Sequence, residues 1–181
     1  MQNIAITQPR MPNIPLLPDG VWRVDPQRSE IGFAVKVLGG LQTVRGVFHA
    51  HEGSLDVRAG AGAGELRIEA DSLDTGQGRR DRHLRSPDFF DVERHPRIVF
   101  TATAVTASDS GLTVTGELAI GSSRLRLEIP VDFQQAADGA LRLDARTTVS
   151  RKAAGVAWNW LGVIHRDATL HARLTLTPAM S

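Results

Sequence analysis

The chain has 181 residues, with 21 basic and 20 acidic side chains, so its formal net charge at pH 7 is +1. A chain of this length forms one domain with a core of its own. The nearly equal numbers of basic and acidic side chains give no indication of nucleic acid or an anionic membrane as a partner. It has no cysteine, which excludes disulfides, thiolate metal sites and cysteine nucleophiles.

Residues 1–20 are expected to form an arm, and residues 21–181 the folded domain. Prolines recur every three residues from Pro9 to Pro18, a pattern typical of an extended, polyproline-like chain. The start lacks a basic segment followed by an apolar one, and no window holds 18 uncharged apolar residues. We therefore expect no signal peptide, no membrane span and a cytoplasmic location.

From residue 22 onward, apolar and polar residues alternate with a period of two, as in strands that bury one face of an antiparallel sheet. In chain order the segments with this pattern are residues 30–38, 43–50, 54–59, 65–70, 96–105, 111–120, 124–133, 140–149 and 169–176. The segment at 96–105 leaves two choices, one with Ile98 and Phe100 facing inward and one with Val99 and Val105. The GAGAG run at 60–64 is expected to be a hairpin turn and not a phosphate loop, because no Lys-Ser/Thr pair follows it.

So many strands of one kind must close into a barrel or pack as a sandwich, because an open sheet would expose its edges. Small residues at the inward positions Gly46, Ala70, Gly116 and Ala145 favour a barrel, which needs strong curvature. One segment interrupts the strands. The sequence therefore predicts an all-β fold, an antiparallel barrel of about eight strands with a short helical insertion near residues 78–93.

The insertion contains the run RRDRHLRSPDFFDVERHP at positions 79–96. It could be an active site, an anion-binding patch or a charged structural corner. We expect helical turns from Gly78 to Arg85 and then a second short helix, with Ser86 as N-cap and Pro87 at its first position. The neighbouring carboxylates favour local neutralisation of the arginines, and Phe89 and Phe90 are expected to point toward the apolar interior.

Candidate catalytic and metal-binding residues are few. His49 and His51 lie two apart on one expected strand, but no third ligand stands at a recognisable spacing, so both are expected to be solvated. His83 could titrate near neutral pH, yet a local structural role is the expectation. No serine lies in a Gly-x-Ser-x-Gly context. We predict no catalytic residue, no metal and no resident cofactor.

Five segments carry a resemblance to a known family: WRVDPQRSEIGFAVK, TVRGVFHAHEGSLDV, ADSLDTGQGRRDRHLRSPDFFDVERHPRIVF, LTVTGELAI and VSRKAAGVAWN. With them the chain resembles the YceI-like family from Trp22 to about Thr177. The most specific block runs from Asp74 to Pro96, where the spacing DxHLRSPDFFDVExxP matches the family's signature. The turn at 121–125 departs from the family, because it lacks the His, Lys and Pro that relatives carry there.

The resemblance implies a lipocalin-like barrel with an elongated apolar cavity for a long isoprenoid or acyl chain, such as an isoprenoid quinone or a fatty amide. It implies no enzymatic reaction, and it implies that the protein could form a homodimer. Relatives are often periplasmic or secreted, whereas this start has no signal-peptide pattern. Aromatic residues make up only 5% of the chain, so inward Val, Leu, Ile and Ala could leave a tunnel open.

We predict that the ligand-binding wall consists of inward apolar residues. They are Ile31, Phe33, Val35, Val37, Val44, Phe48, Leu66, Ile68, Phe89, Phe90, Phe100, Leu118, Leu127, Phe133, Trp158 and Trp160. The two tryptophans could equally close one end of the barrel. The expected function is binding of a long-chain lipid for transport, storage or sequestration. Two alternatives stay open: an enzyme acting on such a lipid through Asp81, His83 or Arg85, and a filled barrel that serves as an interaction module.

Overall fold

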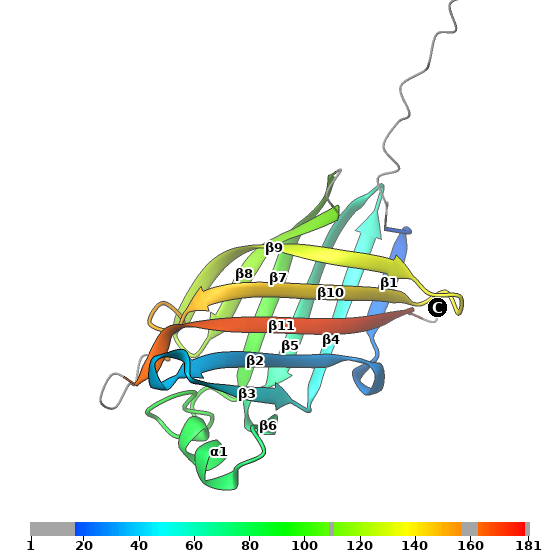
Figure 1. Ribbon diagram of the computed structural model, residues 1–181. Helices are drawn as coiled ribbons and strands as arrows, with labels where there is room; N and C mark the ends of the chain where they lie inside the picture. Colours follow the sequence, from blue (N-terminus) through cyan, green and yellow to red (C-terminus); the bar gives the residue numbers. More distant parts are fainter. Residues whose placement is uncertain (1–16, 109–110, 157–162, 180–181) are drawn as a thin grey trace, which may run out of the picture.

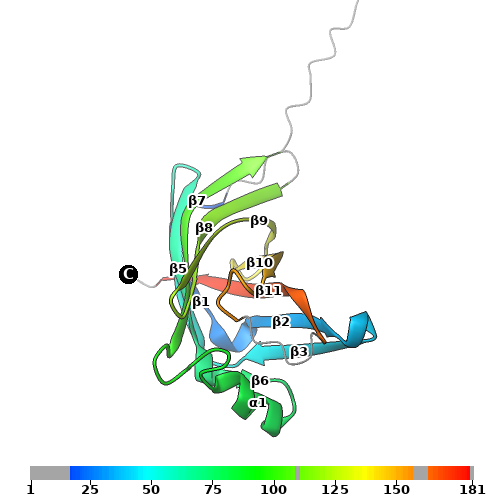
Figure 2. The same ribbon diagram turned by 90° about the vertical axis from the view of Figure 1, so that its left-hand side faces the viewer.

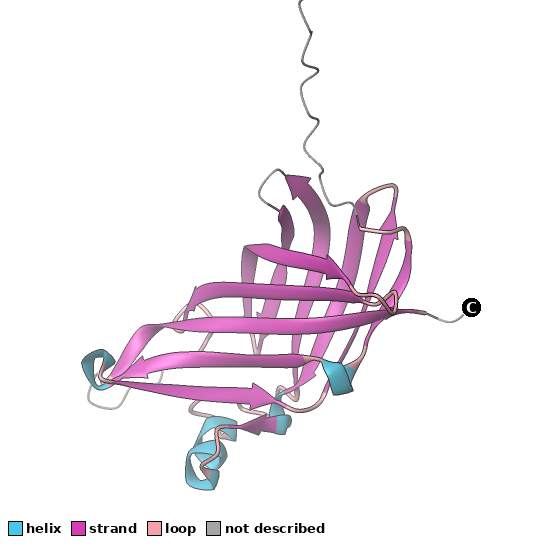
Figure 3. Ribbon diagram, turned by 45° about the vertical axis from the view of Figure 1, so that its right-hand side comes forward, coloured by secondary structure: helices cyan, strands magenta, loops and turns pink. Residues whose placement is uncertain are grey.

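Figure 1 shows the computed structural model of the protein, which describes residues 17–108, 111–156 and 163–179. Within these ranges the chain forms one antiparallel sheet, one α-helix and three 3-10 helices. The strands are β1 (Gly20–Val24), β2 (Glu30–Val37), β3 (Gln42–Phe48), β4 (His51–Arg58), β5 (Ala61–Glu69), β6 (Leu73–Asp74), β7 (Arg97–Ser108), β8 (Gly111–Ile120), β9 (Ser123–Gln135), β10 (Leu141–Ser150) and β11 (Ile164–Pro178). The helices are η1 (Pro26–Arg28), η2 (Leu38–Gly40), η3 (Ala70–Ser72) and α1 (Gly78–Arg85). Figure 3 shows the helices at the edges of the strand framework.

Eight strands form a closed ring in the order β1–β4–β5–β7–β8–β9–β10–β11, and β1 closes it by pairing with β11. The fifteen-residue β11 pairs with β10 along one edge. Along its other edge its last residues pair with β1 and its earlier ones with β2. Beyond β2, the strands β3 and β6 continue the wall, and α1 lies beside β6 (Figures 1 and 2). The predicted antiparallel barrel with a helical insertion is confirmed.

Strand β7 explains why its sequence fits two faces. Its register with β8 shifts between Ala102 and Ala104, which is a β-bulge that adds one residue and reverses the alternation. Before the bulge Ile98 and Phe100 face the interior, and after it Val105 does. Each of the two expected faces is therefore right on one side of the bulge.

The GAGAG run is not a turn along its whole length. The hairpin turn between β4 and β5 consists of Ala59 and Gly60, both with positive φ (51° and 78°), and β5 begins at Ala61. Two-residue turns of this kind match the right-handed twist of the flanking strands. The remaining residues of the run, 61–64, therefore belong to the barrel wall.

His49 and His51 do not share a strand face, because β3 ends at Phe48 and β4 begins at His51. His49 is exposed, with its Nε2 atom 3.4 Å from a carboxylate oxygen of Asp74. His51 is only 8% exposed, so the expectation that both are solvated was wrong for His51. Burial lowers the pKa of His51 below its usual value, because the charged imidazolium loses water there.

This burial predicts an acid-sensitive fold. The unfolded chain titrates His51 near pH 6.5 and the folded chain below it, so the unfolded state binds more protons under mildly acidic conditions. Stability is therefore full above pH 6.5 and falls as the pH drops below it, by up to about 1.4 kcal/mol per pH unit for this one group. Urea unfolding between pH 5 and 8 should show a weaker loss in His51→Gln. The exposed-site control His49→Gln should keep the loss, and equal slopes in the two variants would contradict the prediction.

Candidate binding cavity

A cavity of about 470 Å³ occupies the barrel interior. Apolar side chains from all strands but the two-residue β6 form its wall. Its volume lies within the range typical of small-molecule sites, which are concave and mostly apolar. The barrel is thus hollow, and its interior suits an apolar guest.

Thirteen of the sixteen predicted wall residues line this cavity. They are Ile31, Phe33, Val35, Val37, Val44, Phe48, Leu66, Ile68, Phe89, Phe90, Phe100, Leu118 and Leu127. Phe133 does not, because the thirteen-residue β9 runs past the cavity and Phe133 packs against the buried cluster at that end. Trp158 and Trp160 lie outside the described residues. That these side chains contact a ligand stays a prediction.

Two inward phenylalanines lie against the wall and not across the lumen, because each faces a glycine. A Cβ atom on Gly46 would lie 2.6 Å from the ring of Phe33, and one on Gly116 would lie 2.6 Å from Cζ of Phe100. Glycine lets an aromatic ring cover the bare backbone of the neighbouring strand. The two glycines, expected from the sequence to serve curvature alone, therefore also keep the lumen open.

Phe89 and Phe90 of the insertion lie in the cavity wall. The ring of Phe90 stands edge-on to that of Phe48, with centroids 6.1 Å apart, and Phe89 meets His83 in the same way at 5.1 Å. Such edge-to-face pairs stabilise packing beyond the area they bury. The expectation that both phenylalanines point toward the interior agrees with this placement.

The second helix predicted at Ser86 was wrong. Residues 86–94 form successive turns, and the Ser86 hydroxyl donates to the carbonyl oxygen of His83 at 2.7 Å. Ser86 therefore ends α1 and does not start a new helix. The backbone N–H of Phe90 donates back to the Leu84 carbonyl oxygen, which folds the chain toward the barrel before Asp91, with its positive φ of 46°, reverses it.

The charged residues of the insertion hold this corner together. Arg80 donates from Nε to the Thr75 hydroxyl (2.7 Å) and from Nη2 to the Thr75 carbonyl oxygen (2.8 Å). Arg85 donates to the carbonyl oxygens of Asp71 and Leu73 and lies 2.9 Å from the Asp71 carboxylate. Local bonding occupies both guanidinium groups. Of the three alternatives for this segment, an active site, an anion-binding patch or a charged structural corner, the geometry supports the structural corner.

Asp81 is the buried member of the corner, at 6% exposure. Its carboxylate accepts hydrogen bonds from the backbone N–H and the hydroxyl of Thr75. We expect Asp81→Ala to lower the free energy of unfolding by about 1–3 kcal/mol, because two partly buried donors of Thr75 lose their acceptor. Asp88→Ala is the matched control. That side chain is 57% exposed and 3.5 Å from His83, so its loss should change stability by less than about 0.5 kcal/mol. Equal urea midpoints for the two variants would contradict this role.

The two ends of the cavity differ. At one end, Leu17 lines the cavity and packs with Trp22 and Leu141, which is fully buried. The indole N–H of Trp22 donates to the Pro18 carbonyl oxygen at 3.1 Å, which holds this segment on the barrel. Leu17 and Pro18, in the described part of the expected arm, are thus held at one end of the cavity. Residues 1–16 lie outside the described ranges.

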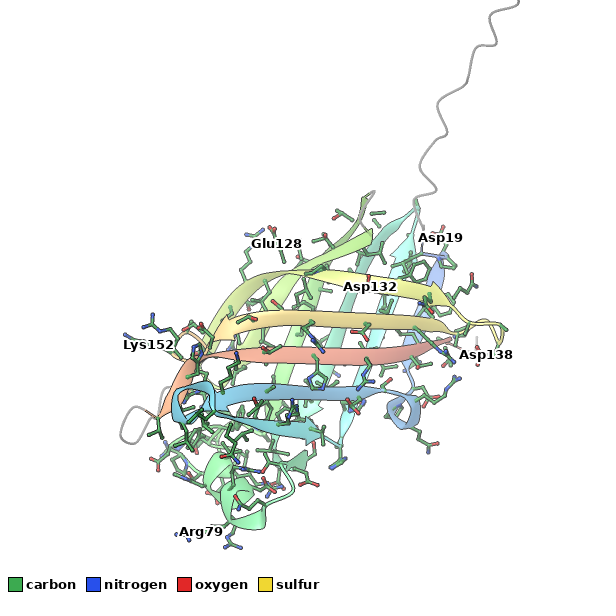
Figure 4. All side chains as sticks on the ribbon, in the orientation of Figure 1. Asp19, Arg79, Glu128, Asp132, Asp138 and Lys152 are labelled. Atoms are coloured by element: carbon green, nitrogen blue, oxygen red, sulfur yellow. The ribbon has the colours of Figure 1, made fainter. Side chains whose placement is uncertain are left out.

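Basic side chains line the cavity toward the other end. They are Arg80 and His83 of α1, and Arg151. Arg151 is 7% exposed and donates from Nη1 to the His165 carbonyl oxygen at 3.0 Å, and burial lowers the pKa of its guanidinium group. Figure 4 places Lys152, the next residue, and Asp19, near Leu17, on opposite sides of the barrel.

Sequence reasoning missed Leu17 and Arg151. The alternation of β10 continues from Ala145 through Thr147 and Val149 to Arg151, so extending the expected segment 140–149 by two residues would have placed the guanidinium inward. Leu17 has no such signal, because it precedes the first alternating segment. Among the described residues no three His, Asp or Glu side chains gather as metal ligands, and no helix there is long and apolar enough to cross a membrane.

Comparison with known proteins gives a family and a fold. The model of the YceI-like domain matches residues 22–176. A UPF0312 protein of Photorhabdus laumondii is 34% identical over 97 residues, and Protein YceI of Escherichia coli is 30% identical over 97 residues. Each alignment covers 52% of this chain and 50% of the relative, so the chain spans about half the length of the curated relatives it matches.

Two solved structures share the barrel at low sequence identity. BcnA of Burkholderia cenocepacia is 20% identical, with a TM-score of 0.77 over 85% of this chain and 99% of its own. A polyisoprenoid binding domain from Saccharophagus degradans is 14% identical, with a TM-score of 0.71 over 87% of this chain and 98% of its own. At such identities the likeness establishes the fold.

Proposed function

Because the chain belongs to the YceI-like domain family, we propose that it binds a long-chain isoprenoid, such as an isoprenoid quinone, or another amphiphilic lipid inside the barrel. The role would be transport, storage or sequestration. The observation that carries the proposal is the apolar cavity of about 470 Å³. The name of the Saccharophagus degradans neighbour, a polyisoprenoid binding domain, supports the same ligand class.

Burial of the ligand's hydrocarbon chain alone supplies enough free energy for binding. Each buried methylene contributes about 0.8 kcal/mol, so about ten buried carbons contribute ~8 kcal/mol before the cost of ordering the ligand. This gross figure corresponds to a dissociation constant near ~1 μM. A polar headgroup then needs to supply orientation and selectivity more than affinity.

We propose a non-enzymatic role, and the bonding of two of the three candidate catalytic residues supports it. Asp81 and Arg85 hold the corner through Thr75, Asp71 and Leu73, and neither lines the cavity. His83 does line the cavity, and it packs edge-on against Phe89. A lipid-transforming enzyme would need a proton-transfer group beside the bound chain. Turnover of a bound lipid that disappears in His83→Ala would favour the enzyme.

The difference between the cavity ends supports one orientation of the ligand, with its tail at Leu17 and its headgroup near Arg151. Leu17→Ala would then make room for about three more carbons, and each added methylene gains about 0.8 kcal/mol where it is buried. We expect the preferred length in a series of prenyl or acyl chains to increase by about that amount. The control Val21→Ala changes an exposed side chain near the same end and should leave the optimum unchanged. An unshifted optimum in Leu17→Ala would contradict the orientation.

Native mass spectrometry of the purified protein, followed by solvent extraction, tests the main proposal. We expect a long-chain lipid at about one molecule per chain. A mass equal to the bare chain, with no uptake of added isoprenoid quinones or fatty amides, would overturn it. The homodimer and the cytoplasmic location remain predictions, to be tested by light scattering and by cell fractionation.

A further inference from the structure

Exposed apolar residues gather at one end of the barrel. Among the described residues, four large apolar side chains are exposed, and three of them are Leu38 (52%), Leu41 (92%) and Val163 (38%). Leu38 and Leu41 lie on the turn between β2 and β3, and the backbone N–H of Leu38 donates to the Val163 carbonyl oxygen at 2.8 Å. These three residues are called the apolar rim below. Apolar side chains that cluster on a surface indicate an interaction site more than scattered ones do.

The apolar rim adjoins the cavity. Val37 directly precedes Leu38, Ile164 directly follows Val163, and these two residues pair across β2 and β11. Both Val37 and Ile164 line the cavity. The rim is therefore one residue away from the cavity wall, at the end where Arg151 also lies.

Leu38 is held in an unfavourable backbone conformation. Its φ is 54°, in the left-handed region that glycine and asparagine adopt more readily than leucine. Its side chain is half exposed, so core packing does not account for the residue. A strained and exposed leucine is consistent with a functional surface.

Positive charge is in excess around the rim. The segments 36–45, 150–156 and 163–167 carry one acidic residue, Asp167, and five cations, which are Lys36, Arg45, Arg151, Lys152 and Arg166. All of these but Arg151 are exposed, and the Lys36 side chain lies over the turn, its Cδ 3.9 Å from where a Cβ of Gly40 would be. The net charge of the whole chain is only +1, so this local excess of positive charge cannot be seen in the overall composition.

We propose that this end of the barrel docks on an anionic lipid bilayer. Leu38, Leu41 and Val163 enter the interface, and the surrounding lysines and arginines contact lipid phosphates. Surface binding of this kind combines buried apolar area with attraction to anionic headgroups. Docked in this way, the cavity end faces the membrane, so a lipid can pass between bilayer and barrel with little exposure to water. The docking goes beyond the proposed cavity function and does not depend on which lipid the cavity holds.

Co-sedimentation with vesicles tests the docking. The wild type should bind vesicles that mix phosphatidylcholine with phosphatidylglycerol and bind pure phosphatidylcholine more weakly. Leu41→Ser should lower binding to the mixed vesicles at least fivefold. Val21→Ser, which changes the fourth exposed apolar residue near the opposite end, should leave it unchanged. Lys36→Glu with Lys152→Glu should abolish the preference for anionic vesicles, since each basic residue near the surface contributes about fivefold.

Three results would overturn the docking. They are no binding of the wild type to either vesicle, equal binding by Leu41→Ser, or a Leu41→Ser variant that changes only the oligomeric mass in light scattering, which would assign the rim to a second copy of the chain. A variant with a blocked cavity, Ala145→Trp, should still bind vesicles. The Ala145→Trp variant therefore distinguishes a failure of docking from a failure of cavity binding.

Discussion

Ala145→Trp should lower the affinity for the bound lipid at least a hundredfold while leaving the barrel folded. Ala145 lines the cavity from the middle of β10, and its neighbours across the sheet are Val131 on β9 and Ala172 on β11. An indole buries about 150–250 Å² of surface and would take the space of several ligand carbons. Excluding about four methylenes at ~0.8 kcal/mol each removes ~3 kcal/mol of binding, which is more than a hundredfold.

Arg146→Trp is the matched control, because adjacent residues of a strand point to opposite faces and Arg146 is exposed. It should retain lipid at the wild-type ratio in native mass spectrometry. The stability of Ala145→Trp distinguishes a hollow barrel from a filled one. In a hollow barrel the indole fills space and the urea midpoint of Ala145→Trp stays near that of wild type. A filled barrel would lose about 1–3 kcal/mol through overpacking, and unchanged lipid retention by Ala145→Trp would contradict the cavity as the site.

The sequence predicted the barrel because seven of the eight ring strands, all but β1, contain an alternating segment with one apolar face. The same alternation identified eleven of the thirteen cavity residues, and the other two, Phe89 and Phe90, come from the insertion. It could not decide the face of β7, because a bulge at Thr103 depends on pairing with β8 and leaves no mark in the strand's own pattern. Turn chemistry at Ser86-Pro87 was ambiguous as well. A serine followed by proline starts helices, yet here tertiary packing of Phe89 and Phe90 draws the chain into turns.

The cavity ends could not be predicted for a different reason. Alternation reports which face of a strand is buried, but not which buried side chains leave space between them. Arg151 lies just beyond β10, two residues past the end of the segment in which alternation was expected. Leu17 lies before β1, where periodicity gives no signal. The apolar rim could not be predicted either, because Leu38 and Val163 are 125 positions apart in the chain and come together through the pairing of β2 with β11.

Gly116→Ala should lower the free energy of unfolding by about 2–4 kcal/mol. A methyl group at this position would collide with the carbonyl oxygen of Thr101 and lie 2.6 Å from Cζ of Phe100. The carbonyl belongs to the backbone of β7 next to its bulge and cannot move without disturbing the ladder with β8. Phe100 lines the cavity, so a ring displaced into the lumen should lower lipid affinity as well.

Gly78→Ala is the control for the change from glycine to alanine itself. No atom lies within 4 Å of the position that its Cβ would take, and alanine in α1 should stabilise by up to about 1 kcal/mol. Phe100→Leu separates the two collisions at Gly116. In the double variant, the smaller side chain should restore lipid binding and only part of the stability, because the collision with Thr101 remains. Strictly additive effects of the two substitutions on lipid affinity would show that the glycine does not hold the ring against the wall.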